Sequence, residues 1–202
     1  MAAPLTIVNV GYRSTNFWVL SVGRSRFLVD LGWWGMFGAL EKELRRKDIP
    51  LAEITYGFAT HFHGDHAGAA QDLKNAGMAL VVTPEQVPHI AGMQRWAKPD
   101  DHYTPITVND TRVVPIAESR AFLAERGLHG QFVHTPGHSD DSVSLLLDSG
   151  EVFTGDLTDP RFIGPEDRDV VMASWRRLRD LGARTVHAGH GPVRPMPTPD
   201  AP

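Results

Sequence analysis

The 202-residue sequence contains no cysteine. A chain without thiols can form no disulfide, no thiolate metal site and no cysteine nucleophile, so nitrogen and oxygen atoms must bind any metal. A strong charge of one sign is also missing, because 20 basic and 24 acidic side chains leave a formal net charge of −4. This balance argues against a surface built to bind the phosphate backbone of nucleic acid.

Long apolar runs are missing as well. No stretch is long enough to span a bilayer, and residues 1–10 lack the basic segment followed by an apolar run that marks a secretory signal. We therefore expect a soluble, cytoplasmic protein that acts on a small molecule and contacts neither membrane nor nucleic acid. A homodimer is compatible with these observations.

Three of the ten histidines, in contrast, lie within one six-residue segment, His61-Phe62-His63-Gly64-Asp65-His66. Residues two apart in an extended backbone point to the same side, so His61 and His63 can bind one cation. Asp65 and His66 follow the turn at Gly64 and can face a second cation. The segment therefore predicts a metal site with two ions.

The neighbouring sequence places this segment at the junction of a strand and a helix. Residues 54–60 form a short apolar run with β-branched and aromatic members, which predicts a buried strand, and residues 67–76 form an alanine-rich helical pattern. The carboxyl ends of strands are where open α/β sheets usually place their sites.

The remaining pattern predicts one domain over residues 1–191 with two β-rich halves that each end in a helix. The helices are expected over 37–46 and 169–181, and the further strands over 5–10, 17–22, 26–30, 79–83, 112–116, 131–134, 143–147, 152–154 and 185–187. Residues 84–105 lack clean periodicity and are interpreted as a substrate-facing loop region. The proline-rich residues 192–202 are expected to form a loosely ordered tail.

Three more residues of metal-binding type follow predicted strands and lie beside glycine. They are His138 in Thr135-Pro136-Gly137-His138, Asp156 in Thr154-Gly155-Asp156 and His190 in Gly189-His190-Gly191. Glycine lets the backbone turn sharply and approach other groups closely. Each alone is more often an ordinary turn residue, but together with the first segment they indicate one site assembled from several loops.

The order of these motifs, from Asp30 in Val29-Asp30-Leu31-Gly32 to His190, resembles the metallo-β-lactamase-fold hydrolase family. The resemblance implies an α/β fold, an αββα sandwich of two mixed β-sheets flanked by helices. It also implies the role of each motif residue: His61, His63 and His138 bind one metal, Asp65, His66 and His190 bind the other, Asp156 bridges both, and Asp30 orients a ligand histidine without binding metal.

Such a site suits hydrolysis. Two cations roughly 3.5–4 Å apart can polarise a substrate oxygen and hold a bridging water whose pKa falls toward about 7, which yields a bridging hydroxide. Five histidines and two aspartates suit two Zn²⁺ ions per chain, although iron and manganese accept the same ligands. The sequence has no GxSxG motif, so we expect hydroxide as the nucleophile and Asp65 as the catalytic residue that positions it and carries a proton.

Positions at which this sequence differs from named subfamilies reduce the number of possible substrate classes. The family's di-iron flavoproteins have glutamate where His63 stands, which argues against redox chemistry. An acid at Asp156 resembles glyoxalase II and lactonases, but the chain is too short for the extra domain of long-form glyoxalase II, and Leu157 and Thr158 stand where a lactonase-type tyrosine would follow. We expect cleavage of a small ester, thioester or lactone. The alternatives are a phosphodiesterase or nuclease, a β-lactamase, and a mononuclear iron sulfur dioxygenase.

Residues beside the motifs allow more than one role. Trp33 and Trp34 follow the Asp30 turn and could form an apolar wall for substrate or simply pack. His187, three residues before His190, could donate a hydrogen bond to a ligand residue or be a buried histidine at a strand end. Asp141 is interpreted as a turn or cap residue.

Overall fold

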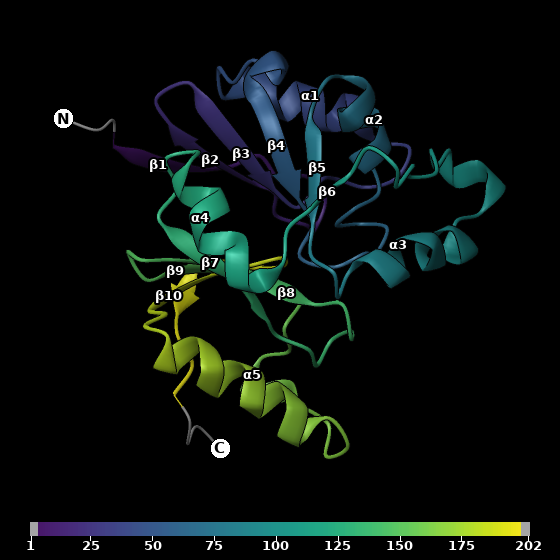
Figure 1. Cartoon of the computed structure of the whole chain (residues 1–202). Coiled ribbons are helices and arrows are strands. Elements are labelled where there is room, and N and C mark those ends of the chain that lie inside the picture. The colour runs from purple at the N-terminus through teal and green to yellow at the C-terminus, as the bar shows by residue number, and fades with distance from the viewer. Residues whose placement is uncertain (1–3, 199–202) are drawn as a thin grey trace.

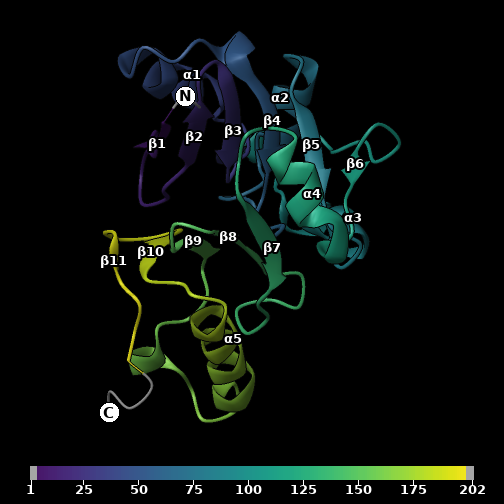
Figure 2. The same ribbon diagram turned by 60° about the vertical axis from the view of Figure 1, so that its left-hand side comes forward.

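Two β-sheets stack on each other with helices on their outer faces (Figures 1 and 2). The computed structural model describes residues 4–198. The first sheet has the order β1 (Leu5–Asn9), β2 (Trp18–Val22), β3 (Ser25–Val29), β4 (Ile54–Phe58), β5 (Ala79–Val82) and β6 (Arg112–Val113). Strands β1 to β3 are antiparallel, and β3 to β6 are parallel.

The second sheet has the order β11 (Arg194–Pro195), β10 (Thr185–Ala188), β9 (Glu151–Gly155), β8 (Val143–Leu147) and β7 (Gly130–His134). Only β9 and β10 pair in parallel. The five α-helices of the described residues are α1 (Phe37–Arg46), α2 (Ala70–Asn75), α3 (Val87–Met93), α4 (Ser119–Ala124) and α5 (Arg168–Asp180). None of them is long and apolar enough to cross a membrane.

Three apolar layers hold these elements together. Strand β2 contributes to two of these layers, because successive side chains of a strand point to opposite faces of the sheet. Val19 packs in the layer under α1 and α2, whereas Trp18 and Leu20 pack between the sheets. In the middle layer Phe58 of β4 stacks on Phe132 of β7 with ring centroids 4.4 Å apart. The third layer seats α5 on the second sheet. The predicted αββα sandwich is confirmed.

Three local predictions are wrong. Residues 84–105 contain α3 and two short 3₁₀ turns at 94–96 and 99–101, and α4 was not predicted from the sequence. Within the predicted loosely ordered tail, Arg194 and Pro195 form an edge strand that pairs with β10. Residues 199–202 of the predicted tail lie outside the described residues. The helix expected over 67–76 begins only at Ala70, because the preceding residues form turns that follow the candidate ligand segment.

Candidate metal centre

The segment of residues 61–66 leaves the carboxyl end of β4 and is held on both sides by hydrogen bonds. The amide N–H of Phe62 donates to Oδ2 of Asp141 at 2.7 Å. The amide N–H of Trp34 donates to the carbonyl oxygen of Gly64 at 3.0 Å. These bonds fix a turn whose side chains are presented to the edge between the two sheets.

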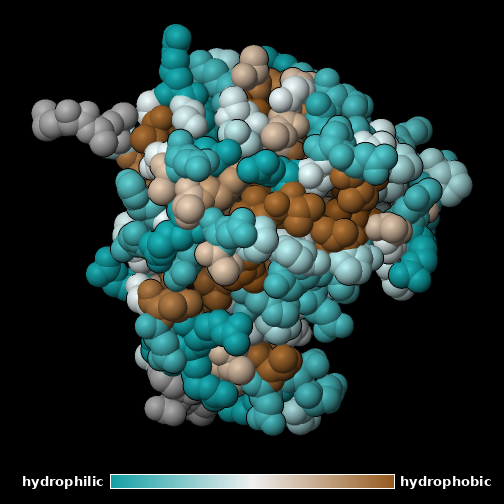
Figure 3. Space-filling model, in the orientation of Figure 1, coloured by the Kyte–Doolittle hydropathy of each residue, from teal (hydrophilic) through white to brown (hydrophobic). Residues whose placement is uncertain are grey.

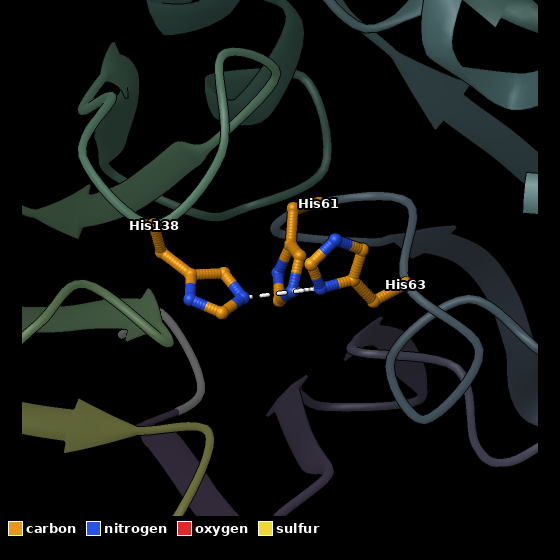
Figure 4. A group of neighbouring side chains, drawn as sticks. All are labelled: His61, His63 and His138. Carbon is orange, nitrogen blue, oxygen red and sulfur yellow. Dashed lines mark hydrogen bonds between the residues drawn. The ribbon is translucent and has the colours of Figure 1, made fainter. Parts of the chain in front are cut away.

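A first group of three imidazoles comes together there (Figure 4). Nδ1 of His63 lies 3.1 Å from Nε2 of His61 and 3.0 Å from Nε2 of His138. Burial lowers the pKa of both His61 and His138. The ring nitrogens of the three imidazoles converge, so they can offer lone pairs to a single cation.

A second group lies beside the first and contains Asp65, His66, Asp156 and His190. Nε2 of His66 is 3.5 Å from Oδ2 of Asp65 and 3.3 Å from Oδ1 of Asp156. Within the described chain, that nitrogen and Oδ1 of Asp156 are buried without a hydrogen-bond partner. Buried polar atoms without partners are costly, so this donor set fits a bound cation.

Asp156 faces both groups. Its Oδ2 lies 3.3 Å from Nε2 of His190 in the second group and 3.7 Å from Nε2 of His138 in the first. Its Oδ1 points to His66. One carboxylate is therefore placed where it can contact two cations at once.

Asp30 contacts Nδ1 of His66, the ring nitrogen that does not face Asp65 and Asp156. Its Oδ1 accepts hydrogen bonds from the amide N–H and the hydroxyl of Thr60 at 2.8 and 2.9 Å, and its Oδ2 lies 3.0 Å from Nδ1 of His66. This arrangement leaves Nε2 of His66 to face the site. A partner of this kind fixes the orientation and tautomer of a ligating imidazole.

Electrostatics differ between the two groups. Burial alone would lower the pKa of His66, but the carboxylates of Asp30 and Asp156 outweigh it and raise that pKa well above its usual range. Contact with Asp156 raises the pKa of His190 to about 9. Burial would raise the pKa of Asp156, yet the neighbouring imidazoles hold it below its usual range. Protons and a metal therefore compete for the same nitrogen atoms in the second group.

The profile described as "Metallo-beta-lactamase superfamily" matches residues 10–190. The chain belongs to the metallo-β-lactamase superfamily. The lactamase-like protein nscB of Trichophyton rubrum is 31% identical over 185 residues, 89% of this chain and 49% of that protein. The atrochrysone carboxyl ACP thioesterase of Aspergillus fumigatus is 30% identical over 188 residues, 90% of this chain and 52% of that protein. The chain thus spans about half the length of these relatives.

Two solved structures share the fold of this chain. The family protein TTHA1429 of Thermus thermophilus superposes with a TM-score of 0.73 at 20% identity, over 95% of this chain and 75% of that one. The protein TTHA1623, solved in a di-iron-bound form, superposes with a TM-score of 0.72 at 26% identity, over 95% of this chain and 94% of that one. The resemblance inferred from the motif order is confirmed.

Glycine at position 189 is required by the geometry of the second ligand group. A Cβ atom there would lie 2.5 Å from both Oδ1 of Asp156 and Cε1 of His66. Contacts that short do not occur without a shift of the neighbours. The glycine before His190 thus lets the last loop approach Asp156 and His66 of the second group.

The two tryptophans pack beside the segment of residues 61–66 and the turn between β1 and β2. Trp34 covers Gly64, where an added Cβ would meet the indole at 2.6 Å, and its ring packs edge-on against Tyr103. Trp33 donates a hydrogen bond from Nε1 to the hydroxyl of Thr15 at 3.0 Å. Neither is among the residues that line the two cavities adjoining His63, and the apolar substrate wall that the two tryptophans could form stays a prediction.

His187 is not brought to the ligand groups. Its ring stacks on Phe153 and packs edge-on against Trp18, with centroids 4.7 Å away in both cases. Both of its nitrogens are buried without a hydrogen-bond partner among the described residues. Of the two roles considered for His187, the structure agrees with a buried histidine at a strand end, because its side chain faces the layer between the sheets.

Other supporting residues escaped the sequence reasoning. Asp141 binds the ligand segment through the amide of Phe62, although its sequence context indicated only a turn. The carbonyl oxygen of Ser14 accepts a hydrogen bond from Nδ1 of His190 at 2.7 Å, across 176 residues of sequence. No local pattern marks such a residue, because any amino acid has a carbonyl oxygen.

Two adjoining cavities open beside the first ligand group, with volumes of about 290 and 280 Å³. Both are lined by Phe62, His63, Met93 and Trp96, and α3 with the following turn forms one wall. Trp96 is 76% exposed. Figure 3 shows apolar residues gathered in a band across the middle of the molecule at the level of α3. Residues 87–96 therefore flank the centre as a helical wall.

Proposed function

We propose that this protein is a metal-dependent hydrolase that binds two zinc ions and cleaves a small ester, thioester or lactone. The observation that carries the proposal is the position of Asp156, whose two oxygens face the three-histidine group and the mixed group at the same time. Membership of the superfamily and the thioesterase names among its relatives support a hydrolase.

The chemistry divides between the metals and the chain. Two cations held in these groups would supply Lewis acidity and lower the pKa of a coordinated water to about 7. Asp65 lies at the boundary between the second group and the smaller cavity, and its side chain is 21% exposed. It can therefore take a proton from water and deliver it to the leaving group of a substrate bound in that cavity.

The cavities support a substrate with an apolar acyl group. Phe62, Met93 and Trp96 present apolar surface next to His63, which belongs to the first ligand group. The relatives named atrochrysone carboxyl ACP thioesterases favour a thioester among the three bond types. In this arrangement the acyl group lies along α3 and its carbonyl carbon lies over the ligand groups.

The donor set favours zinc. Five imidazoles and two carboxylates with no sulfur suit Zn²⁺, and the same ligands accept iron. The solved di-iron form of TTHA1623 makes iron the alternative.

Elemental analysis of the purified protein, before and after reconstitution with zinc or iron, tests this proposal when it is combined with assays on thioester, lactone, β-lactam and phosphodiester substrates. We expect two metals per chain and the highest kcat/KM on a thioester or a related ester. A maximum of one metal after reconstitution in excess zinc would argue against the dinuclear centre. Preferred cleavage of a phosphodiester or a β-lactam would overturn the substrate class.

A further inference from the structure

The turn between β1 and β2 reaches across to the last loop of the second sheet. We call residues Ser14–Asn16 the turn clip. The amide N–H of Asn16 donates to the carbonyl oxygen of Gly189 at 2.7 Å, and its Nδ2 donates to the carbonyl oxygens of Ala188 and Gly191 at 3.0 and 2.8 Å. Thr15 and His190 form an isolated β-bridge. The turn clip is thus joined to the loop that carries His190.

Thr15 also contacts a second ligand residue. Its hydroxyl lies 3.4 Å from Oδ2 of Asp65 and receives a hydrogen bond from Nε1 of Trp33 at 3.0 Å. An indole N–H can only donate, so it occupies a lone pair of the hydroxyl oxygen and leaves the hydroxyl proton for the carboxylate. Only 2% of Thr15 is exposed, so water does not compete for this hydroxyl.

The oxygen of Asp65 that Thr15 contacts is the one that faces the other ligands. Oδ2 of Asp65 lies 3.3 Å from Nε2 of His190 and 3.5 Å from Nε2 of His66. A carboxylate oxygen has more than one lone pair and can accept the threonine proton while it binds a cation. Without that bond the carboxylate could rotate away from the second ligand group.

We propose that Thr15, with its hydroxyl oriented by Trp33, is a positioning residue that holds Oδ2 of Asp65 toward the second metal and so sets the affinity of that metal. This rests on the dinuclear centre of the proposed function. Groups that orient metal ligands from behind typically change metal affinity about 10- to 100-fold. A single hydrogen bond at 3.4 Å places the expected effect near the lower end.

The test compares three variants with the wild-type protein. Thr15→Val keeps the shape and removes the hydroxyl, Thr15→Ser keeps the hydroxyl, and Trp33→Phe keeps an aromatic ring but removes the N–H donor. Thr135→Val is the matched control, because Thr135 is also buried and, among residues 4–198, its hydroxyl bonds only to Ser144, at 2.8 Å. Circular dichroism checks that each variant folds.

The readout is the zinc dissociation constant of each site, measured by chelator competition, together with the visible spectrum of the cobalt-substituted protein. We expect Thr15→Val to weaken the second site about 10-fold and to alter its cobalt spectrum, Trp33→Phe to weaken it less, and Thr15→Ser to restore it. The first site and the Thr135→Val protein should match the wild type.

Three results would overturn the proposal. The first is a Thr15→Val protein with an unchanged second site, the second is an equal loss at both sites, and the third is a Thr15→Ser protein as impaired as Thr15→Val. Because the affinities are measured without substrate, a protein that binds two metals but cleaves no ester would overturn the proposed function alone. A wild-type protein that binds a single metal would overturn both.

Discussion

Replacement of Asp30 by asparagine separates the charge of this residue from its shape. Asp30 is 1% exposed and has a φ of 61°, a left-handed conformation that asparagine tolerates. The amide N–H of Thr60, which contacts Oδ1 of Asp30 at 2.8 Å, can only donate. The carbonyl oxygen of the new asparagine must therefore face Thr60, and its NH₂ group must face Nδ1 of His66.

This orientation exchanges the tautomer of His66. When a metal is bound to Nε2 of the wild-type His66, the ring proton must lie on Nδ1, which is 3.0 Å from a carboxylate oxygen of Asp30. Opposite an NH₂ group Nδ1 must accept, and the proton moves to Nε2, where it blocks coordination. Partners of ligating histidines are typically worth 10- to 100-fold in metal affinity, about 1.4 to 2.7 kcal/mol. We expect Asp30→Asn to lie near the upper end, since it both removes the charge and reverses the tautomer.

Chelator competition on the folded protein measures this effect as two metal dissociation constants. Asp141→Asn is the matched control, because Asp141 is equally buried but accepts from the amide of Phe62, which an asparagine oxygen can also do. We expect Asp30→Asn to weaken the second metal alone and Asp141→Asn to leave both unchanged. A wild-type second-site affinity in Asp30→Asn would refute the tautomer argument, and equal losses at both sites would show that Asp30 supports the loop in general.

Three further changes test other parts of the structure. Asp65→Asn should keep the fold and at least one metal but lose about 10²- to 10⁴-fold in kcat; near-full activity in steady-state assays would exclude its proton role. Burial lowers the pKa of His187, so its contribution to stability is present above the unfolded value of about 6.5 and is lost as pH falls below it. His187→Phe should therefore melt with a weaker pH dependence between pH 7 and 5, and an unchanged slope would contradict this. Gly189→Ala should lower the metal content of the protein, because the added methyl group crowds Asp156. In the control Gly38→Ala the methyl group meets open space in α1, and we expect the free energy of unfolding to rise by about 0.5 to 1 kcal/mol. Equal metal loss in both variants would show that the crowding argument is wrong.

The elements that the sequence predicted well carry strong local patterns. Helix α5 has 13 residues, enough for its apolar face to be visible as a period. Helix α3 has only seven residues and contains Pro88 and Gly92, so its intrinsic preference for a helix is weak. Its buried residues Ile90 and Met93 join the apolar layer with α1 and α2, and tertiary packing decides its conformation. The interpretation of this region as a loop failed for that reason.

The amino-acid sequence alone determined which side chains of metal-binding type are available, because their spacing and their glycine neighbours are local properties of the chain. Apart from Asp30, which the family resemblance assigned to a ligand histidine, it did not determine which groups hold those side chains in place. Thr15 and Asp65 are 50 residues apart, and Ser14 and His190 are 176 apart, yet each pair is in contact. Such contacts exist only after the two sheets have packed, since hydrogen bonds depend on distance and angle in space and leave no periodic pattern in the sequence. For the same reason His187, three residues from a ligand, faces the core, whereas Thr15 lies beside the candidate metal centre.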